Sequence, residues 1–404
     1  MGEVVSRRRF LQQGSTVAAG AALVGRATAG LGDETKRDMK YRRFGRTGLM
    51  VSEIGVGCAT GGYAGDALPA ARLLAAASGC LITHPNVVNG AALYWRDPRI
   101  HYVEGWALDR FAAGELDLRS VRSQRLGLLL DAGIEDELRL RHLQVADGCR
   151  ATLGLDIGPV VTTDTPLDVS LELGPSGASW GRLGRPDALL RAGDRLRAAG
   201  ATAIAVVARF PDDPGSTALA AYRKGSGVDA LAGAEAVISH LLSRHLLLPC
   251  AHAPALQPLP LQSGLDPRAA GEELGTTFLP CVLVGLSRAP DLLPRPSAGS
   301  LNAPLARAPS DGPLLRREEI GVVVAPAGAL GGESVLACVE RGVPLIAVDN
   351  PCVLEVTAAA LALEEAGVTV LPAAGYSEAA GLVLALREGI APTALRRPLV
   401  PLED

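Results

Sequence analysis

Short apolar runs alternate along the chain with longer segments rich in alanine and leucine. Five runs predict strands, at residues 81–83, 126–130, 160–163, 202–208 and 281–286. The intervening segments have helical spacing, and the clearest of them are 187–199 and 231–247. This alternation predicts an α/β fold with largely parallel sheets and flanking helices.

The pattern is interrupted between residues 289 and 314, where proline, serine, alanine and glycine dominate and predict a linker. An apolar strand pattern, a glycine-rich turn and a helical pattern follow the linker. We therefore expect two α/β units, a main one over residues 59–288 and a smaller one over residues 315–404.

Composition excludes several classes of protein. The net charge of −4 provides no electrostatic footprint for nucleic acid, and 3% aromatic residues provide no stacking platform. The sequence contains no run of 18 uninterrupted apolar residues, so we expect no membrane span in the mature protein. The seven cysteines are scattered and form no CxxC pair, unlike a disulfide scaffold or a structural zinc knuckle.

The N-terminus carries three arginines at residues 7–9, a weakly apolar run, and then Ala27-Thr28-Ala29. Residues 1–29 thus resemble a twin-arginine signal peptide with an A-x-A cleavage site, although an arginine-rich disordered start has a similar composition. The resemblance predicts export to the periplasm or an equivalent compartment. Without a genuine leader the chain would be cytoplasmic.

Residues 40–57, within the segment 30–58, resemble the opening of an aldo/keto reductase. That family also needs Asp, Tyr, Lys and His in fixed contexts, but no tyrosine follows Asp109 at the right interval. Lys224 is the only lysine after Lys40. We therefore expect neither a complete reductase barrel nor reductase chemistry, and nothing indicates NADP.

Most of the chain, from about residue 60 to 390, is similar to a family described only as a domain of unknown function and known chiefly from cyanobacteria and plants. The similarity is carried by the motifs around His84-Pro-Asn86, Glu104-Gly-Trp106 and Cys250-Ala-His252. It implies no particular reaction.

Cys250 and His252 are the leading catalytic candidates. In an extended segment, residues i and i+2 project to the same side, and the flanking prolines favour extension. A thiolate beside an imidazole is a nucleophile–base pair or half of a metal site. The alternative is a buried cysteine beside a histidine that bonds to backbone. His84 or Cys281 is the expected third partner.

Any acid–base partner must be distant in sequence, with Glu104, Asp109 and Glu235 as the candidates. His240 and His245 are about 140° apart around one helix, so they do not form a metal pair. At least one of them is expected to face solvent or the helix end.

Polar residues follow several expected strands, and parallel strands would gather them along one edge, where α/β sheets bind ligands. On this basis we expect Asn86, Asn89, Asp131 and Arg209 to bind substrate, beside His84. Each alone is equally consistent with a turn or helix cap.

In the last segment, Gly331, Gly332 and Ser334 precede a helix in a unit that resembles the nucleotide-sugar half of two-domain glycosyltransferases. Their backbone N–H groups would bind an anion. Three functions therefore stay open: a small-molecule enzyme with a Cys/His site, a nucleotide- or sugar-phosphate-binding transferase, and a non-catalytic ligand-binding protein. The corresponding cofactor is a divalent metal or a nucleotide.

Overall fold

The computed structural model describes residues 43–44, 49–50, 55–56, 67–85, 97–173, 179–213, 215–227, 229–273, 278–295, 312–350, 355–399 and 401. The chain divides into two units, Met1–Met39 and Lys40–Asp404, and every described residue lies in the second. The expected leader and most of the reductase-like segment lie outside the described residues.

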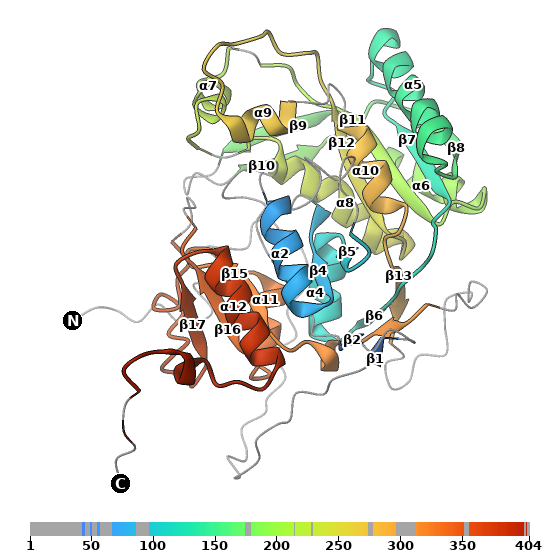
Figure 1. The fold of residues 1–404 in the computed structure, drawn as a ribbon. Helices are drawn as coiled ribbons and strands as arrows, with labels where there is room; N and C mark the ends of the chain where they lie inside the picture. Colours follow the sequence, from blue (N-terminus) through green and yellow to red (C-terminus); the bar gives the residue numbers. More distant parts are fainter. Residues whose placement is uncertain are drawn as a thin grey trace. The chain divides into compact units, whose positions relative to one another are not determined.

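A six-stranded parallel sheet contains strands from both ends of this unit (Figure 1). Its spatial order is β17 (Val370–Ala373), β16 (Leu345–Val348), β15 (Val323–Pro326), β3 (Gly55–Val56), β4 (Leu81–Thr83) and β5 (Ile100–Tyr102). The order runs outward in both directions from the β3–β15 pair. This is the arrangement of a doubly wound sheet, in which ligands bind at the carboxyl ends of the strands.

Helices cover both faces of this sheet because its strands alternate apolar side chains to either side. Helices α2 (Leu68–Ser78) and α12 (Tyr376–Arg387) pack with Val324 and Ile346 on one face. Helix α11 (Glu333–Val339) and the end of α4 (Gly105–Ala113) pack with Val323 and Leu345 on the other.

A second parallel sheet has four strands, in the order β12 (Cys250–Ala255), β11 (Ala203–Arg209), β7 (Leu126–Leu130) and β8 (Ile157–Thr162). All five residues of β7 are buried, as expected for a parallel strand that is covered on both faces. Helices α5 (Asp136–Leu153) and α10 (Leu279–Leu286) cover one face, whereas α6 (Pro186–Ala198) and α8 (Ala232–Leu246) cover the other.

Smaller elements complete the described part of the chain. They are the antiparallel pair β1 (Arg43–Phe44) and β2 (Leu49–Met50), the antiparallel pair β9 (Val169–Leu173) and β10 (Ser179–Leu183), the three strands β13 (Asp291–Pro294), β6 (Leu116–Arg119) and β14 (Leu314–Leu315), the short helices α7 (Thr217–Arg223) and α9 (Pro267–Glu273), and the 3₁₀ turns η2 (Arg317–Glu319) and η3 (Pro392–Leu395).

The structure confirms the mixed α/β class with parallel sheets, and no closed barrel forms in the described part of the chain. Two expectations were wrong. Residues 281–286 belong to helix α10, because a short apolar run buried between α5 and β12 has no periodicity to separate helix from strand. The strand ends also do not share one edge, since β4 joins β15–β17 while β7 and β11 form the other sheet.

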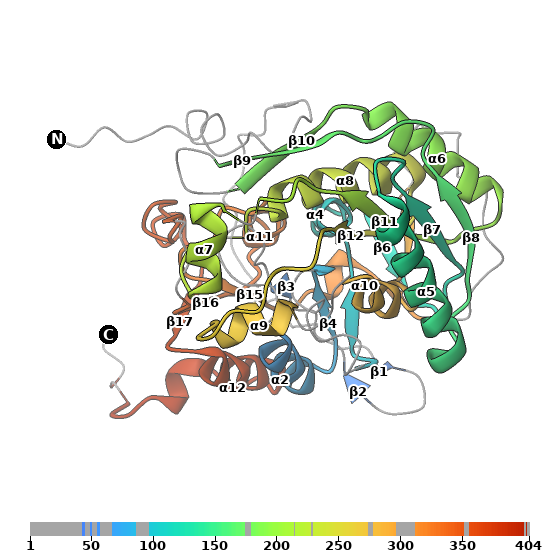
Figure 2. The ribbon, with the colours of Figure 1, turned by 90° about the horizontal axis from the view of Figure 1, so that it is seen from above.

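The two sheets meet through helices. Helix α8 lies against both β12 of its own sheet and α4 at the edge of the other (Figure 2). The four-stranded sheet lies, in sequence, entirely between β5 and β15. None of the described helices has the length and apolar character needed to cross a membrane.

Candidate active site

A histidine and a glutamate lie beyond the carboxyl ends of two adjacent strands of the six-stranded sheet. His84 directly follows β4, and Glu104 lies two residues beyond the end of β5. Because β4 and β5 are parallel neighbours, both residues lie at their carboxyl ends. The exposed fractions are 9% for His84 and 3% for Glu104, so both residues are buried.

Glu104 is held in place by the helix that it begins. Its Oε2 accepts hydrogen bonds from the backbone N–H groups of Trp106 (2.9 Å) and Ala107 (3.4 Å), which caps α4. Its other oxygen, Oε1, lies 3.0 Å from Nε2 of His240 on α8. The cap therefore fixes one carboxylate oxygen and leaves the other facing the histidine.

Gly105 provides room for the two histidine rings. A Cβ at this position would lie 2.7 Å from Nε2 of His240 and 3.2 Å from both Nε2 and Cδ2 of His84. Both Nε2 atoms thus converge on the first residue of α4. One ligand atom from each of His84, Glu104 and His240 lies within 4.8 Å of the other two.

The pKa values of the two imidazoles shift in opposite directions. Burial, together with positive charge on His240 and His252, lowers the pKa of His84 to about 3, so His84 is neutral at physiological pH. Burial also acts to lower the pKa of His240, but attraction to Glu104, Asp109 and Glu333 outweighs it and raises that pKa above the ordinary value.

A second histidine–carboxylate pair, which is buried, joins α8 to β12. Nε2 of His252, on β12, is 3.2 Å from Oε2 of Glu235, and its Nδ1 is 2.5 Å from Oγ of Ser239. Glu235 and Ser239 are one turn apart on α8, and Ser239 precedes His240. Of the three expected acidic partners, Glu235 is therefore the one beside His252, while Glu104 contacts His240.

Cys250 does not have the surroundings of a nucleophile. It projects from β12 to the α8 side, as His252 does, but it is fully buried in the apolar core and donates a weak hydrogen bond to the carbonyl of Leu248 (3.3 Å). Burial raises the pKa of the thiol well above its ordinary range, so a thiolate is not populated near neutral pH. Cys281 is also buried, within α10.

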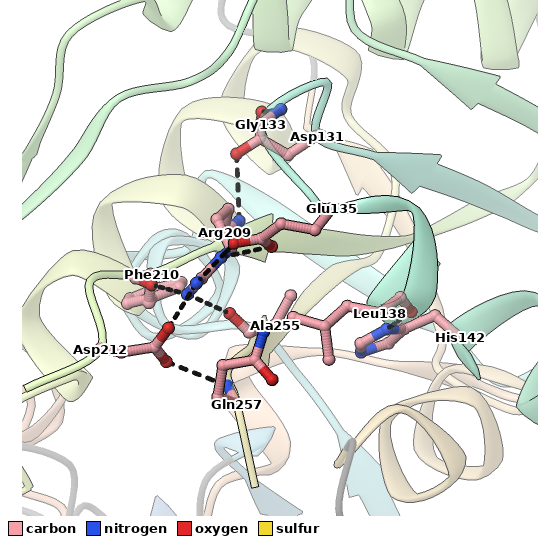
Figure 3. Close-up of polar contacts among 10 residues, drawn as sticks. All are labelled: Asp131, Gly133, Glu135, Leu138, His142, Arg209, Phe210, Asp212, Ala255 and Gln257. Atoms are coloured by element: carbon pink, nitrogen blue, oxygen red, sulfur yellow. Dashed lines mark hydrogen bonds and ion pairs between the residues drawn. The ribbon is translucent and has the colours of Figure 1, made fainter. Parts of the chain in front are cut away.

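Asp131 and Arg209 do come together, at the carboxyl edge of the four-stranded sheet (Figure 3). The buried Asp131 carboxylate accepts hydrogen bonds from the backbone N–H groups of Gly133 (2.9 Å), Leu167 (3.0 Å) and Arg209 (3.0 Å). The Arg209 guanidinium is bound by the carboxylates of Glu135 and Asp212. The Asp131 carboxylate and the Arg209 guanidinium are therefore both engaged by protein groups, and their contacts connect the loops at this edge of the sheet.

The glycine-rich turn at Gly331 and Gly332 leads into α11, as the sequence predicts. The backbone N–H of Ser334 donates to Oδ1 of Asp109 on α4 (3.0 Å), and Glu333 forms an ion pair with Arg110 (2.6 Å). A protein carboxylate therefore already occupies the anion position expected at Ser334. Asn86 and Asn89 lie outside the described residues.

The helical spacing of His240 and His245 did not predict the contact of His240 with Glu104. His245, five residues further, pairs with Asp194 (2.9 Å), so the two histidines do face different surroundings. The partners of His240, however, lie more than 130 residues earlier in the chain, and no local spacing reports such a contact. In the sequence, the cluster is indicated only by two of its members, His84 at the end of β4 and Glu104 beyond β5.

The fold and the site define a mixed α/β protein with a cluster of buried and half-buried histidines and glutamates where a doubly wound sheet meets a second parallel sheet. Residues 47–396 match the family described as "Protein of unknown function (DUF3326)", and the chain belongs to that family. It is 53% identical over 350 residues to an uncharacterised lipoprotein of Synechococcus sp.. The aligned residues make up 86% of this chain and 93% of the relative. No solved structure matches significantly.

Proposed function

We propose that the protein is an enzyme that moves protons on a small-molecule substrate bound beside α4 and α8. The observation that carries the proposal is a pair of histidine–carboxylate contacts made by α8, in which His240 of that helix contacts Glu104 and Glu235 of that helix contacts His252. A histidine beside a carboxylate is an arrangement that general acid–base sites use.

His252 has the better arrangement for general acid–base work. In the proposed mechanism Glu235, 3.2 Å from Nε2 of His252, accepts the proton on that nitrogen, and Nδ1 exchanges a proton with the Ser239 hydroxyl. The carboxylate stabilises the imidazolium that forms when Nδ1 takes up a proton. Ser239 Oγ is then the group through which the proton passes between His252 and the substrate.

The location supports a small-molecule substrate. His84 and Glu104 lie at the carboxyl ends of parallel strands, where such sheets bind ligands, and junctions between folding units are common ligand sites. The transferase alternative loses support because Asp109 occupies the anion position at Ser334. A ligand-binding protein without turnover is the alternative that the experiment must exclude.

The experiment is an unbiased turnover screen. The purified full chain is incubated with a pooled metabolite extract, and mass spectrometry records what is consumed and formed. We expect His252→Gln and Glu235→Gln to slow the conversion by about 10²–10⁴-fold. His245→Gln, an exposed position on the same helix, serves as the matched control. Equal conversion by wild type and His252→Gln, or ligand retention without any conversion, would refute the enzyme proposal.

We also propose an exported or membrane-associated location. The relative's description as a lipoprotein and the N-terminal arginines support this proposal. A double Arg7→Lys, Arg8→Lys variant should stay in the cytoplasm on cell fractionation if the twin-arginine route is used. Export of that variant at the wild-type level would argue against the route.

A further inference from the structure

We propose that His84, Glu104 and His240 bind a divalent transition-metal ion. The inference deepens the proposed function, on which it rests for the reaction class, although metal binding itself is independent of it. Two imidazoles and one carboxylate are the protein ligands of many catalytic zinc sites, and the same set binds iron(II) in other enzymes. Such three-ligand sites leave open positions for water or substrate.

The Glu104 carboxylate provides the observation that points to a ligand. Its Oε2 is bound by the α4 backbone, but Oε1 is buried and has no hydrogen-bond partner in the described structure. Nε2 of His240 is only 3.0 Å away, yet the pair is not aligned as a hydrogen bond. A buried carboxylate oxygen without a donor is destabilising, and a cation would relieve this.

The spacing suits a metal. Ligand atoms about 2.0–2.1 Å from a tetrahedral ion lie roughly 3.3 Å from each other. The Glu104–His240 distance of 3.0 Å is close to this value, and the set as a whole lies within 4.8 Å. An adjustment of the side chains would bring the third ligand atom to the coordination distance. Nε2 of His84 already faces the same side of Gly105 as Nε2 of His240.

The three ligands come from rigid and independent supports. His84 follows a strand, Glu104 caps a helix, and His240 lies within a helix of the other sheet. Sites on such elements hold their geometry better than sites on loops. The absence of a side chain at Gly105 keeps the space between the rings free.

A metal here would narrow the chemistry of the proposed function. Zn²⁺ held by His84, Glu104 and His240 would act as a Lewis acid that makes water a stronger acid and nucleophile at neutral pH. His252 on β12, paired with Glu235 of α8, would then accept the proton of that water and return it to the product. Hydrolysis or hydration of a polar small molecule is accordingly the reaction class that we infer.

The test uses metal alone as the probe. The purified full chain is treated with chelator, dialysed against limiting Zn²⁺ or Co²⁺, and analysed by elemental analysis and, for Co²⁺, visible absorption. We expect one equivalent of bound ion. Glu104→Gln and His240→Gln should weaken binding by about 100-fold or more, because changing even an outer partner of a ligand costs 10–100-fold. Gln at position 104 retains an oxygen for the α4 cap, and circular dichroism checks the fold.

Two controls separate the outcomes. His245→Gln lies on the same helix and should bind the ion as wild type does, and so should His252→Gln. No stoichiometric binding by wild type, or undiminished binding by folded Glu104→Gln, would overturn the metal inference. Stoichiometric metal binding without any turnover would instead leave the site standing and overturn the proposed enzyme.

Discussion

Asp109 offers a stability test of the contact between α4 and α11. Its carboxylate accepts from the backbone N–H of Ser334, and burial together with the charge of Glu333 raises its pKa from 3.8 to about 6. The folded state therefore binds this proton more tightly than the unfolded state does. It follows that ionised Asp109 lowers the free energy of unfolding, and that this loss grows as the pH rises from about 4 to above 6.

A shift of this size corresponds to at most about 3 kcal/mol at pH 8 and to about half of that at pH 5. Asp109 is partly exposed, so the measured values should be smaller. Asp109→Asn keeps an oxygen for the Ser334 N–H but carries no charge. We expect the variant to be more stable than wild type, with a gain at pH 8 that exceeds the gain at pH 5 by about 1 kcal/mol.

Urea denaturation of both proteins at the two pH values measures this difference. Asp147→Asn, on the exposed side of α5, controls for the loss of one negative charge. An equal gain at both pH values, or a loss of stability at pH 8, would show that the buried charge at Asp109 does not oppose folding.

Three further predictions concern single side chains. Gly105→Ala should displace the His84 and His240 rings, weaken Zn²⁺ binding in the elemental assay and destabilise the fold by about 1–3 kcal/mol; unchanged metal binding would contradict the close approach at 2.7 Å. Cys250→Ala should lower the free energy of unfolding by about 1–2 kcal/mol through the cavity it leaves, with turnover and metal content unaffected; loss of turnover in the folded variant would restore the cysteine as a nucleophile. Asp131→Asn should destabilise by about 2–3 kcal/mol in urea, because one carboxylate oxygen that accepts a backbone N–H is replaced by a donor; a wild-type transition midpoint would argue against that role.

The fold class was accessible from the sequence because parallel strands read as short apolar runs. Residues 126–130 and 202–208 were recognisable in this way, and the helix over 231–247 was recognisable from its length. Sheet membership was not accessible, since β4 pairs with β3 and β5 but shares its sheet with strands more than 240 residues later. The strand prediction for residues 281–286 was wrong because burial on all sides removes the periodicity that separates helix from strand.

The candidate site could be predicted only in part, because its residues are also brought together by contacts between distant parts of the chain. His252 and its side of the strand followed from the extended Cys-Ala-His segment, and Glu235 was among the candidate partners. A catalytic role of Cys250 stays a prediction, and it is disfavoured by burial, which raises the pKa of the thiol and which the sequence does not report. The His84–Glu104–His240 cluster depends on the contact between α4 and α8, which sets residues from two sheets side by side.

The order in which the ribosome makes these strands has a consequence for assembly. Strands β3, β4 and β5 emerge first, but the other edge of β3 is paired by β15, which begins only at Val323. Until then, the growing chain exposes an open strand edge of the kind that invites aggregation. A product truncated before that point would keep the histidine and glutamate of the first half while lacking half of the sheet on which they depend. We therefore expect shortened chains to be captured by chaperones or degraded rather than to persist as partly active fragments.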